Sequence, residues 1–290
     1  MSVRSSKIKI GCNPTVSRSH RHPASPVSLC RSLFKYRALI GSLVKREVVG
    51  RYRGSAFGLL WSFFNPVFML LVYTFVFSVV FKARWPGGSE SKTEFALVLF
   101  AGLMLFNFFA ECVNRAPSLI LSNVNYVKKV VFPLEILPCV ALGSAFFHLL
   151  ISLTVWIAFY LVFYGVPHAT ILLFPVVVFP LIILVLGVSW FLSALGVYLR
   201  DVSQFIGIVT TVLMFMSPIF YSASILPERY RPFLHLSPLT VVVEQARSVL
   251  FWGGGIDWVT WSIYTVAAFA IAALGYAWFQ RTRKGFADVL

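Results

Sequence analysis

Few side chains in this sequence could carry out acid–base or nucleophilic chemistry. A histidine beside a carboxylate is a common pair for proton transfer, and the candidates within the apolar stretches are Glu135, His148 and His168. Because these three lie at different depths of the predicted helices, they form no cluster at one membrane face. We interpret His148 as a hydrogen-bonded packing residue, since the pattern places no acid beside it in mid-helix.

The sequence also lacks the short motifs of common catalytic sites. It contains no GxxxxGK[ST] phosphate loop, no HExxH pair and no Ser/His/Asp arrangement in its structural context. The four cysteines show no CxxC spacing, which argues against a disulfide or a metal site. The residues therefore predict no enzyme, no metal site and no cofactor in this chain. Energy for any uphill process has to come from another protein.

The composition is typical of a membrane protein. Of the 290 residues, 59% are hydrophobic and 12% are charged, and the mean hydropathy is +0.83. Soluble domains of this length do not reach such values. The formal charge of +15 could indicate nucleic acid, but the basic residues flank apolar runs and form no RNA-binding or helix-turn-helix pattern. We expect no nucleic acid partner and assign the charge to membrane orientation.

Six apolar segments predict membrane-spanning helices, at residues 57–81, 95–112, 134–164, 171–199, 205–221 and 258–280. The third and fourth exceed about 25 residues, so we expect them to be tilted or broken at Pro138, Pro175 and Pro180. Basic residues concentrate in the segments that this topology leaves in the cytoplasm, beginning with residues 45–53. The sequence thus predicts an all-α integral membrane protein with both termini cytoplasmic.

The first predicted span has two distinct faces. Large aromatic residues recur at helical spacing on one side, which is typical of packing against lipid and neighbouring helices. On the other side, Asn65 is costly in hydrocarbon without a partner or water, and Pro66 leaves a carbonyl one turn earlier unpaired. We expect this second face, with Ser62, Met69 and Tyr73, to look into protein or a cavity.

The segments around the first two spans have their own patterns. Residues 1–33 contain no acidic residue and no long apolar run, which favours a disordered basic cytoplasmic tail, with a transit peptide as the alternative. Residues 34–49 have the two-sided pattern of an interfacial helix, which fits a plain juxtamembrane anchor or a collar for a cytoplasmic partner equally well. Residues 115–133 are too polar and too short to cross, and they predict a short cytoplasmic helix with a loop.

Residues 222–255 are the only external segment long enough to close a channel. Ser237 and Pro238 can cap and begin a short amphipathic helix. Glu244 and Arg247 fall on its polar side, where we expect them to stay in water. The helix either lies on the outer surface or enters the membrane as a re-entrant hairpin. A passive surface helix without a gating role is the competing interpretation.

Three stretches, in order and spacing, resemble one family. They are KREVVGRYRGSAFGLLWSFFNPVFMLLVYTFVF, SNVNYVKKVVFPLEILP and ALGVYLRDVSQFIGIVTTVLMFMSPIFYSASILPERYRPFLHLSPL. From residue 34 to its end, the chain resembles the membrane subunit of ABC-2 type ABC transporters that export polysaccharides. In bacteria this group handles O antigen, capsule and teichoic acid. The individual motifs are loose, and the assignment rests on all three being in register.

The resemblance implies a set of partners and a place in the cell. It implies a homodimer of six-span subunits with two copies of a separate ATPase, which binds ATP and Mg²⁺, in the bacterial inner membrane. The cargo would be a polysaccharide linked to undecaprenyl, O antigen before others, which passes from cytoplasm to periplasm at the dimer centre. Aromatic rings suit such a cargo because the C–H face of a pyranose stacks on them.

The resemblance also implies three groups of site residues. Residues that couple to the ATPase are expected in the interface helix (34–49), just after it, and in the segment 115–129. They are Arg46, Glu47, Arg51, Ser118, Leu119, Ile120, Leu121, Asn125, Lys128 and Lys129. The channel would be lined by Trp61, Asn65, Met69, Tyr73, Phe77, Thr210, Met214, Ser217 and Tyr221. The external gate helices, within residues 225–251, would include Leu239, Val242, Val243, Glu244 and Arg247.

Other functions fit parts of the same pattern. An exporter of capsule or teichoic acid would share the architecture, and an exporter of drugs or small lipids would share the broad fold. A membrane glycosyltransferase or acyltransferase would need a His/Asp/Glu cluster at one membrane face. Co-purification with an ATPase would exclude the transferase, and accumulation of undecaprenyl-linked polymer in a deletion strain would exclude the drug or small-lipid exporter.

Overall fold

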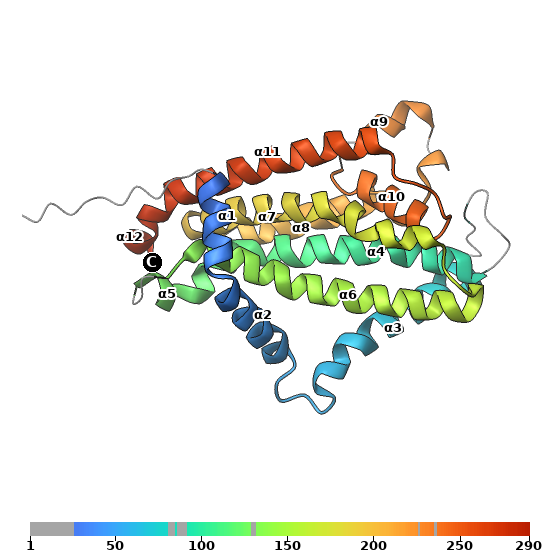
Figure 1. The fold of residues 1–290 in the computed structure, drawn as a ribbon, viewed down its shortest axis with the longest axis horizontal. Coiled ribbons are helices and arrows are strands. Elements are labelled where there is room, and N and C mark those ends of the chain that lie inside the picture. The colour runs from blue at the N-terminus through green and yellow to red at the C-terminus, as the bar shows by residue number, and fades with distance from the viewer. Residues whose placement is uncertain (1–25, 81–84, 86–91, 129–131, 226, 235–236) are drawn as a thin grey trace, which may run out of the picture.

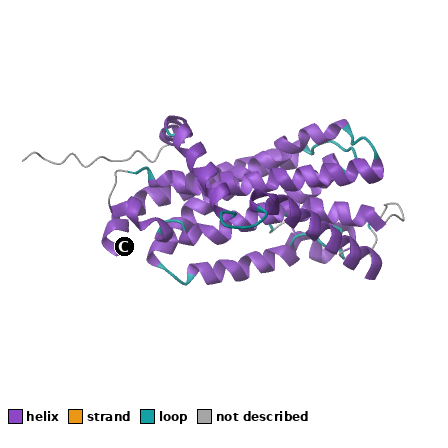
Figure 2. Cartoon of the chain, turned by 90° about the horizontal axis from the view of Figure 1, so that it is seen from below, coloured by secondary structure: helices purple, strands orange, loops and turns teal. Residues whose placement is uncertain are grey.

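The computed structural model describes residues 26–80, 85, 92–128, 132–225, 227–234 and 237–290, and every regular element in these ranges is helical (Figure 2). The longer helices are α1 (Pro26–Lys35), α2 (Arg37–Arg51), α3 (Trp61–Tyr73), α4 (Lys92–Arg115), α6 (Leu137–Tyr164), α7 (Phe174–Tyr198), α8 (Val202–Met216), α10 (Thr240–Leu250) and α11 (Trp258–Thr282). The short helices are α5 (Val124–Lys128), α9 (Arg231–Leu234) and α12 (Phe286–Val289), with single 3-10 turns at Gly58–Leu60, Ala116–Ser118, Leu121–Asn123, Leu134–Ile136, Ala223–Ile225, Glu228–Tyr230 and Arg283–Gly285 and a longer one at Ala169–Leu173. Residues Thr74–Val80 continue α3 as a π-helix.

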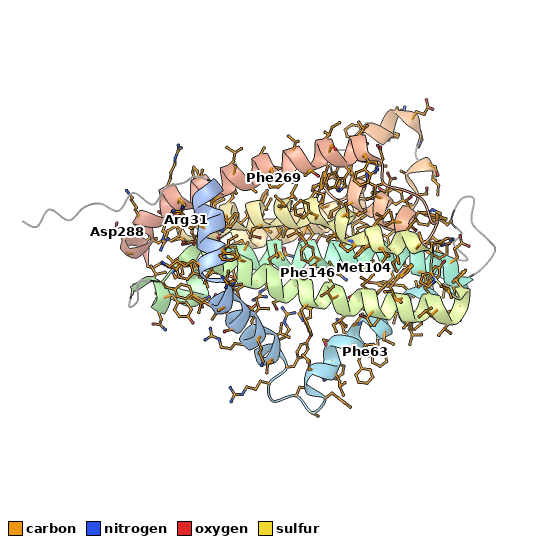
Figure 3. All side chains as sticks on the ribbon, viewed as in Figure 1. Arg31, Phe63, Met104, Phe146, Phe269 and Asp288 are labelled. Atoms are coloured by element: carbon orange, nitrogen blue, oxygen red, sulfur yellow. The ribbon has the colours of Figure 1, made fainter. Side chains whose placement is uncertain are left out.

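The bundle is built around α4. This helix packs against α6, α7, α8 and α10, while α11 lies along α7 at one edge of the molecule (Figure 1). Helices α2 and α3 form a V against α6 at the opposite edge. Met104 of α4 lies in the interior, whereas Phe63 of α3 points away from the bundle (Figure 3). Helices α1, α5 and α12 gather at one end, here called the terminal end, and α9 and α10 lie toward the other.

Five of the six predicted spans are confirmed as long apolar helical segments. They are Gly58–Phe77, Thr93–Ser118, Leu134–Tyr164, Ala169–Tyr198 and Trp258–Val289. Each has enough length and hydropathy to cross a bilayer of about 30 Å. The chain is therefore an all-helical protein with several membrane spans.

The predicted span at residues 205–221 is shorter in the structure. It corresponds to α8, whose 15 residues extend roughly 22 Å at 1.5 Å per residue. The helix ends at Met216 because Ser217 is extended (φ −80°, ψ 147°) and Pro218 follows it, and a residue before proline disfavours the helical conformation. The prediction extended this helix too far, to Tyr221, because the apolar character of the sequence continues past its end.

The prolines do not break the long helices as predicted. Pro138 and Pro175 lie in the first turns of α6 and α7, where a missing N–H costs no hydrogen bond. Pro180 lies inside α7, which continues through it to Tyr198. Helix α7 packs along α11 and remains continuous through Pro180.

The N-terminal part is more structured than the sequence indicated. Helix α1 begins at Pro26, inside the segment predicted as a tail, and residues 1–25 lie outside the described part of the chain. The single interfacial helix predicted at 34–49 is divided at Tyr36, whose φ of −98° and ψ of 13° separate α1 from α2. Helix α2 packs its buried Leu43 and Val48 toward the bundle and contacts α6.

Candidate functional site

Two ion pairs clamp α2 to the terminal half of α4. The Arg115 Nη2 atom lies 2.6 Å from Glu47 Oε1, and Arg51 Nη2 lies 2.6 Å from Glu111 Oε1. All four side chains are partly exposed, so the attraction is screened by solvent and each pair is individually weak. Because both pairs join the same two helices, they fix the register of α2 along α4. Glu47 and Arg51, predicted to contact an ATPase, are thus engaged within the chain.

His148 of α6 joins this clamp, and its contacts correct the interpretation that no acid lies beside it. Its Nδ1 atom lies 3.0 Å from Glu111 Oε2 and 3.1 Å from Arg51 Nη1, and its Nε2 atom lies 3.2 Å from the Tyr52 hydroxyl. An acid therefore does lie beside His148, contributed by a helix distant in sequence. Burial raises the pKa of the Tyr52 hydroxyl, so it stays protonated and remains able to donate. The prediction that His148 is a hydrogen-bonded packing residue agrees with these contacts.

The segment predicted to couple to an ATPase forms two 3-10 turns and the short helix α5. Leu119 and Ile120 are buried, and Ile120 belongs to the core cluster that includes Trp190. A Cβ on Gly196 would lie 2.1 Å from the Pro117 carbonyl oxygen, so the backbones of this segment and α7 touch directly. The segment is consequently anchored to the bundle by its buried apolar side chains.

The exposed side of this segment is polar. Its exposed residues are Ser118, Ser122, Asn125 and Lys128, with Leu121 half-buried. Arg46 of α2 donates to the Tyr126 hydroxyl at 3.0 Å, and Lys128 donates to the carbonyl of Leu290. Lys129 lies outside the described residues. Helix α2, α5 and the C-terminus therefore form one continuous surface at the terminal end.

The predicted channel residues on α3 lie on or beside the part of the helix that no other helix covers, here called its open side. Trp61, Asn65 and Met69 are exposed, while Tyr73 and Phe77 are half-buried. Phe77 stacks between Phe95 and Phe220. Other residues form the narrow strip that packs into the bundle. They are Ser62, Pro66 and Leu70, which recur at a spacing of four.

A ladder of aromatic rings continues the open side of α3. Phe57, Trp61, Phe64 and Phe68 follow one another with centroid distances of 5.6, 6.4 and 6.2 Å. Edge-to-face and tilted pairs of this kind rigidify the exposed surface. On the second face, Asn65 and Met69 are exposed in the single chain, whereas Ser62 is buried. That this face looks into protein or a cavity stays a prediction.

The predicted channel residues on α8 are divided. Thr210 donates to the Asn114 side chain at 3.0 Å, and the Ser217 hydroxyl lies 2.6 Å from that of Ser237. Both Thr210 and Ser217 are buried and cannot line a channel in this structure, which corrects the prediction for these two. Met214 and Tyr221 are half-buried. The polar stripe of α8 instead satisfies its hydrogen bonds against α4 and the segment before α10.

Helix α10 is buried inside the domain. Leu239, Val242 and Val243 are almost fully buried, in agreement with the prediction that they pack on the membrane domain. The helix packs against α4 and α7, and the side that carries Glu244 is open. The assigned helix begins at Thr240, with Leu239 at the cap position, which is later than predicted. The Ser237 hydroxyl still accepts from the Leu239 N–H at 3.3 Å, as a capping side chain does, and it also bonds to Ser217.

Arg247 contradicts the prediction of a side chain in water. It is 1% exposed, and its guanidinium donates to the carbonyl oxygens of Val98 (3.0 Å), Pro218 (2.5 Å) and Ile219 (2.6 Å). The same group lies 4.5 Å from the centre of the Trp85 ring. Three carbonyls at the end of α8 and along α4 thus depend on one cation. Glu244 is exposed as predicted.

Comparison with known proteins decides the family. The model of the ABC-2 type transporter family matches residues 38–251. The chain belongs to the ABC-2 type transporter family. An O-antigen export system permease protein RfbA from Klebsiella pneumoniae is 27% identical over 254 residues, which cover 87% of this chain and 95% of the relative.

A second relative supports this membership. An RfbA of the same description from Myxococcus xanthus is 29% identical over 227 residues, covering 78% of this chain and 85% of the relative. Both alignments cover more than three quarters of this chain and of the relative. As an ABC-2 permease, the chain is a transporter subunit and not an enzyme.

Three structural roles in this ABC-2 chain were missed by the sequence interpretation. Arg247 follows Val243 by four positions, so a stricter reading of helical spacing would have placed it on the buried side. Glu135 pairs with Arg283 at 2.7 Å and accepts from Ser32, which ties α1 and the C-terminal end of α11 to the start of α6. No sequence signal joins residues so far apart in the chain, and the same holds for Glu111 and His148.

Proposed function

We propose that this chain is the membrane-spanning subunit of an ATP-driven exporter that moves O-antigen polysaccharide on a lipid carrier out of the cytoplasm. The observation that carries the proposal is the similarity, over 87% and 78% of this chain, to two permeases that are both described as O-antigen export proteins. In this proposal two copies of the chain form a homodimer in the bacterial inner membrane. Two copies of a separate ATPase bind ATP and Mg²⁺ and supply the energy.

The open aromatic side of α3 supports a glycan path. The ring ladder from Phe57 to Phe68 presents flat apolar surfaces with Asn65 nearby. Sugar rings stack on aromatic faces through their C–H sides, while polar neighbours bind their hydroxyls. In the homodimer, α3 and the exposed side of α8 face the central path, and an undecaprenyl carrier stays in the surrounding lipid.

The terminal end supports the position of the ATPase. In this proposal both termini are cytoplasmic, so the polar surface made by Ser118, Ser122 and Asn125 faces the ATPase. Because α2 is clamped to α4 and linked to Tyr126, a push on this surface moves α2, α4 and α5 together. Coupling by such a rigid unit needs no large change in any one contact.

Helix α10 is the outer gate in this proposal. Arg247 ties it to the end of α8, so α10 and α8 move as one unit when the path opens. This gate differs from the external surface helix that the sequence predicted, because α10 is part of the packed bundle.

A deletion strain tests the export function. Removal of the gene should abolish O polysaccharide at the cell surface and cause undecaprenyl-linked polymer to accumulate inside, and the wild-type chain should restore export. Purification of the tagged chain should recover the ATPase. Normal surface polysaccharide in the deletion strain, with a changed tolerance to drugs, would overturn the assignment of cargo.

A further inference from the structure

A groove of about 410 Å³ lies on the outer side of α7 and α11, at the edge of the bundle opposite α3. Gly187 and Gly275 lie at its floor, Phe191 and Trp278 pack against each other across the helix crossing beside them, and Arg281 lies at its terminal end. A volume of several hundred cubic ångströms is enough for a small organic ligand. The groove belongs to none of the surfaces used by the proposed function.

Two glycines at the floor of the groove bring α7 and α11 into backbone contact. A Cβ on Gly187 would lie 2.5 Å from the Ala272 Cα atom, and a Cβ on Gly275 would lie 2.1 Å from the Gly187 oxygen. Such distances are far below van der Waals contact, so only glycine allows α7 and α11 to approach this closely. The concave strip therefore lies over the crossing of the two helices and not between them.

The walls of the groove are apolar, and its terminal end is cationic. The Phe191 and Trp278 rings lie 5.8 Å apart, and Leu274 beside them is 71% exposed. Arg281 follows Trp278 by three residues and is exposed; it makes no hydrogen bond or ion pair with any residue in the described part of the chain. Tryptophan and arginine in succession at the end of a span are typical of the headgroup level of a membrane.

We propose that this groove binds one anionic glycerophospholipid, with an acyl chain lying along the surface of the α7–α11 crossing and the phosphate on Arg281. The guanidinium offers paired donors that match phosphate oxygens. From Ile271 to Arg281 the groove extends roughly 15 Å along α11, about half of a hydrocarbon layer of about 30 Å. That length fits an acyl chain within one leaflet and is short for a polyprenyl carrier.

The test is lipid binding by the full-length chain in detergent, measured by native mass spectrometry with added phosphatidylglycerol, phosphatidylcholine and undecaprenyl phosphate as probes. The wild type should retain one phosphatidylglycerol per chain and at least tenfold less phosphatidylcholine. Arg281→Gln should weaken phosphatidylglycerol retention about tenfold. Lys284→Gln is the matched control, because it removes the same charge from an exposed residue that does not line the groove.

A second variant separates the groove from general attraction by charge. Leu274→Trp narrows the groove without touching Arg281 and should reduce retention of phosphatidylglycerol while the protein still elutes as a single species. Equal losses in Arg281→Gln and Lys284→Gln, or full retention in Leu274→Trp, would overturn the proposal. Preferential retention of undecaprenyl phosphate would also overturn it, since the groove would then hold the carrier.

Discussion

Helices α3 and α4 have similar hydropathy and opposite surroundings. The corresponding spans, Gly58–Phe77 and Thr93–Ser118, have mean hydropathies of 1.8 and 2.1. In their most apolar parts, however, 17% of the first and 83% of the second is buried within the chain. Helix α4 packs on all sides against other helices, and α3 packs along one narrow strip that ends at Leu70. Hydropathy therefore indicates that a segment crosses the membrane and says nothing about its neighbours. The remaining surface of α3 is available to lipid, a second copy or cargo.

The largest expected effect on stability concerns Arg247, which is buried where α10 packs against α4. Arg247→Met should leave the carbonyls of Pro218 and Ile219 without their donor and remove the contact with Val98, and each buried unsatisfied acceptor costs roughly 1–3 kcal/mol. We expect a loss of about 3 kcal/mol or more in the free energy of unfolding, seen as a large drop in the thermal midpoint in detergent. Arg229→Met is the control, because Arg229 is exposed. Equal midpoints for both variants would show that Arg247 does not hold α10.

The next effect contrasts two residues of α3 itself. Leu70→Ala should destabilise the chain by about 2–5 kcal/mol, because Leu70 is almost fully buried against the bundle. Phe68→Ala, on the open side, should change stability by less than about 0.5 kcal/mol. Export of polysaccharide should nevertheless fall in Phe68→Ala. Unchanged export in a strain with normal amounts of this variant would remove α3 from the glycan path.

A smaller effect concerns the clamp between α2 and α4. Glu111→Gln removes the charge that Arg51 and His148 share, and we expect a loss of about 1 kcal/mol, since Arg51 is partly exposed. Hydrogen exchange should become faster in α2 and stay unchanged in α7. If α2 keeps its protection, its packing against α6 and the Glu47 pair hold it without the Glu111 charge.

The smallest effect on stability is expected at the exposed coupling surface. Ser118→Glu and Asn125→Glu should leave the thermal midpoint unchanged and weaken the association with the ATPase, because both side chains are exposed beside the buried Ile120. Arg229→Glu, at the opposite end, is the control for added negative charge. These variants are more informative than alanines at Leu119 and Ile120, which would damage the core. Full ATPase binding by both variants would place the contact elsewhere.

Much of the fold could be predicted from the sequence, because apolar runs of sufficient length have one stable form in a membrane. The positions of five spans and the polar turn after α4 followed from this constraint. The site was less predictable. The partners of Glu111 and Arg247 come from helices far apart in the chain, and periodicity alone does not say which side of a helix meets another. The end of α8 was misjudged because one proline outweighed a continuous apolar pattern.

The proposed export function is tested most directly by vectorial transport in inverted membrane vesicles that contain this chain and its ATPase. Vesicles are supplied with lipid-linked O polysaccharide, and protection from an added glycoside hydrolase is measured with and without ATP. ATP should make the polymer resistant to the enzyme, and Phe68→Ala vesicles with normal ATPase association should not protect it. Polymer that stays fully accessible in wild-type vesicles while ATP is hydrolysed would contradict the proposed export function.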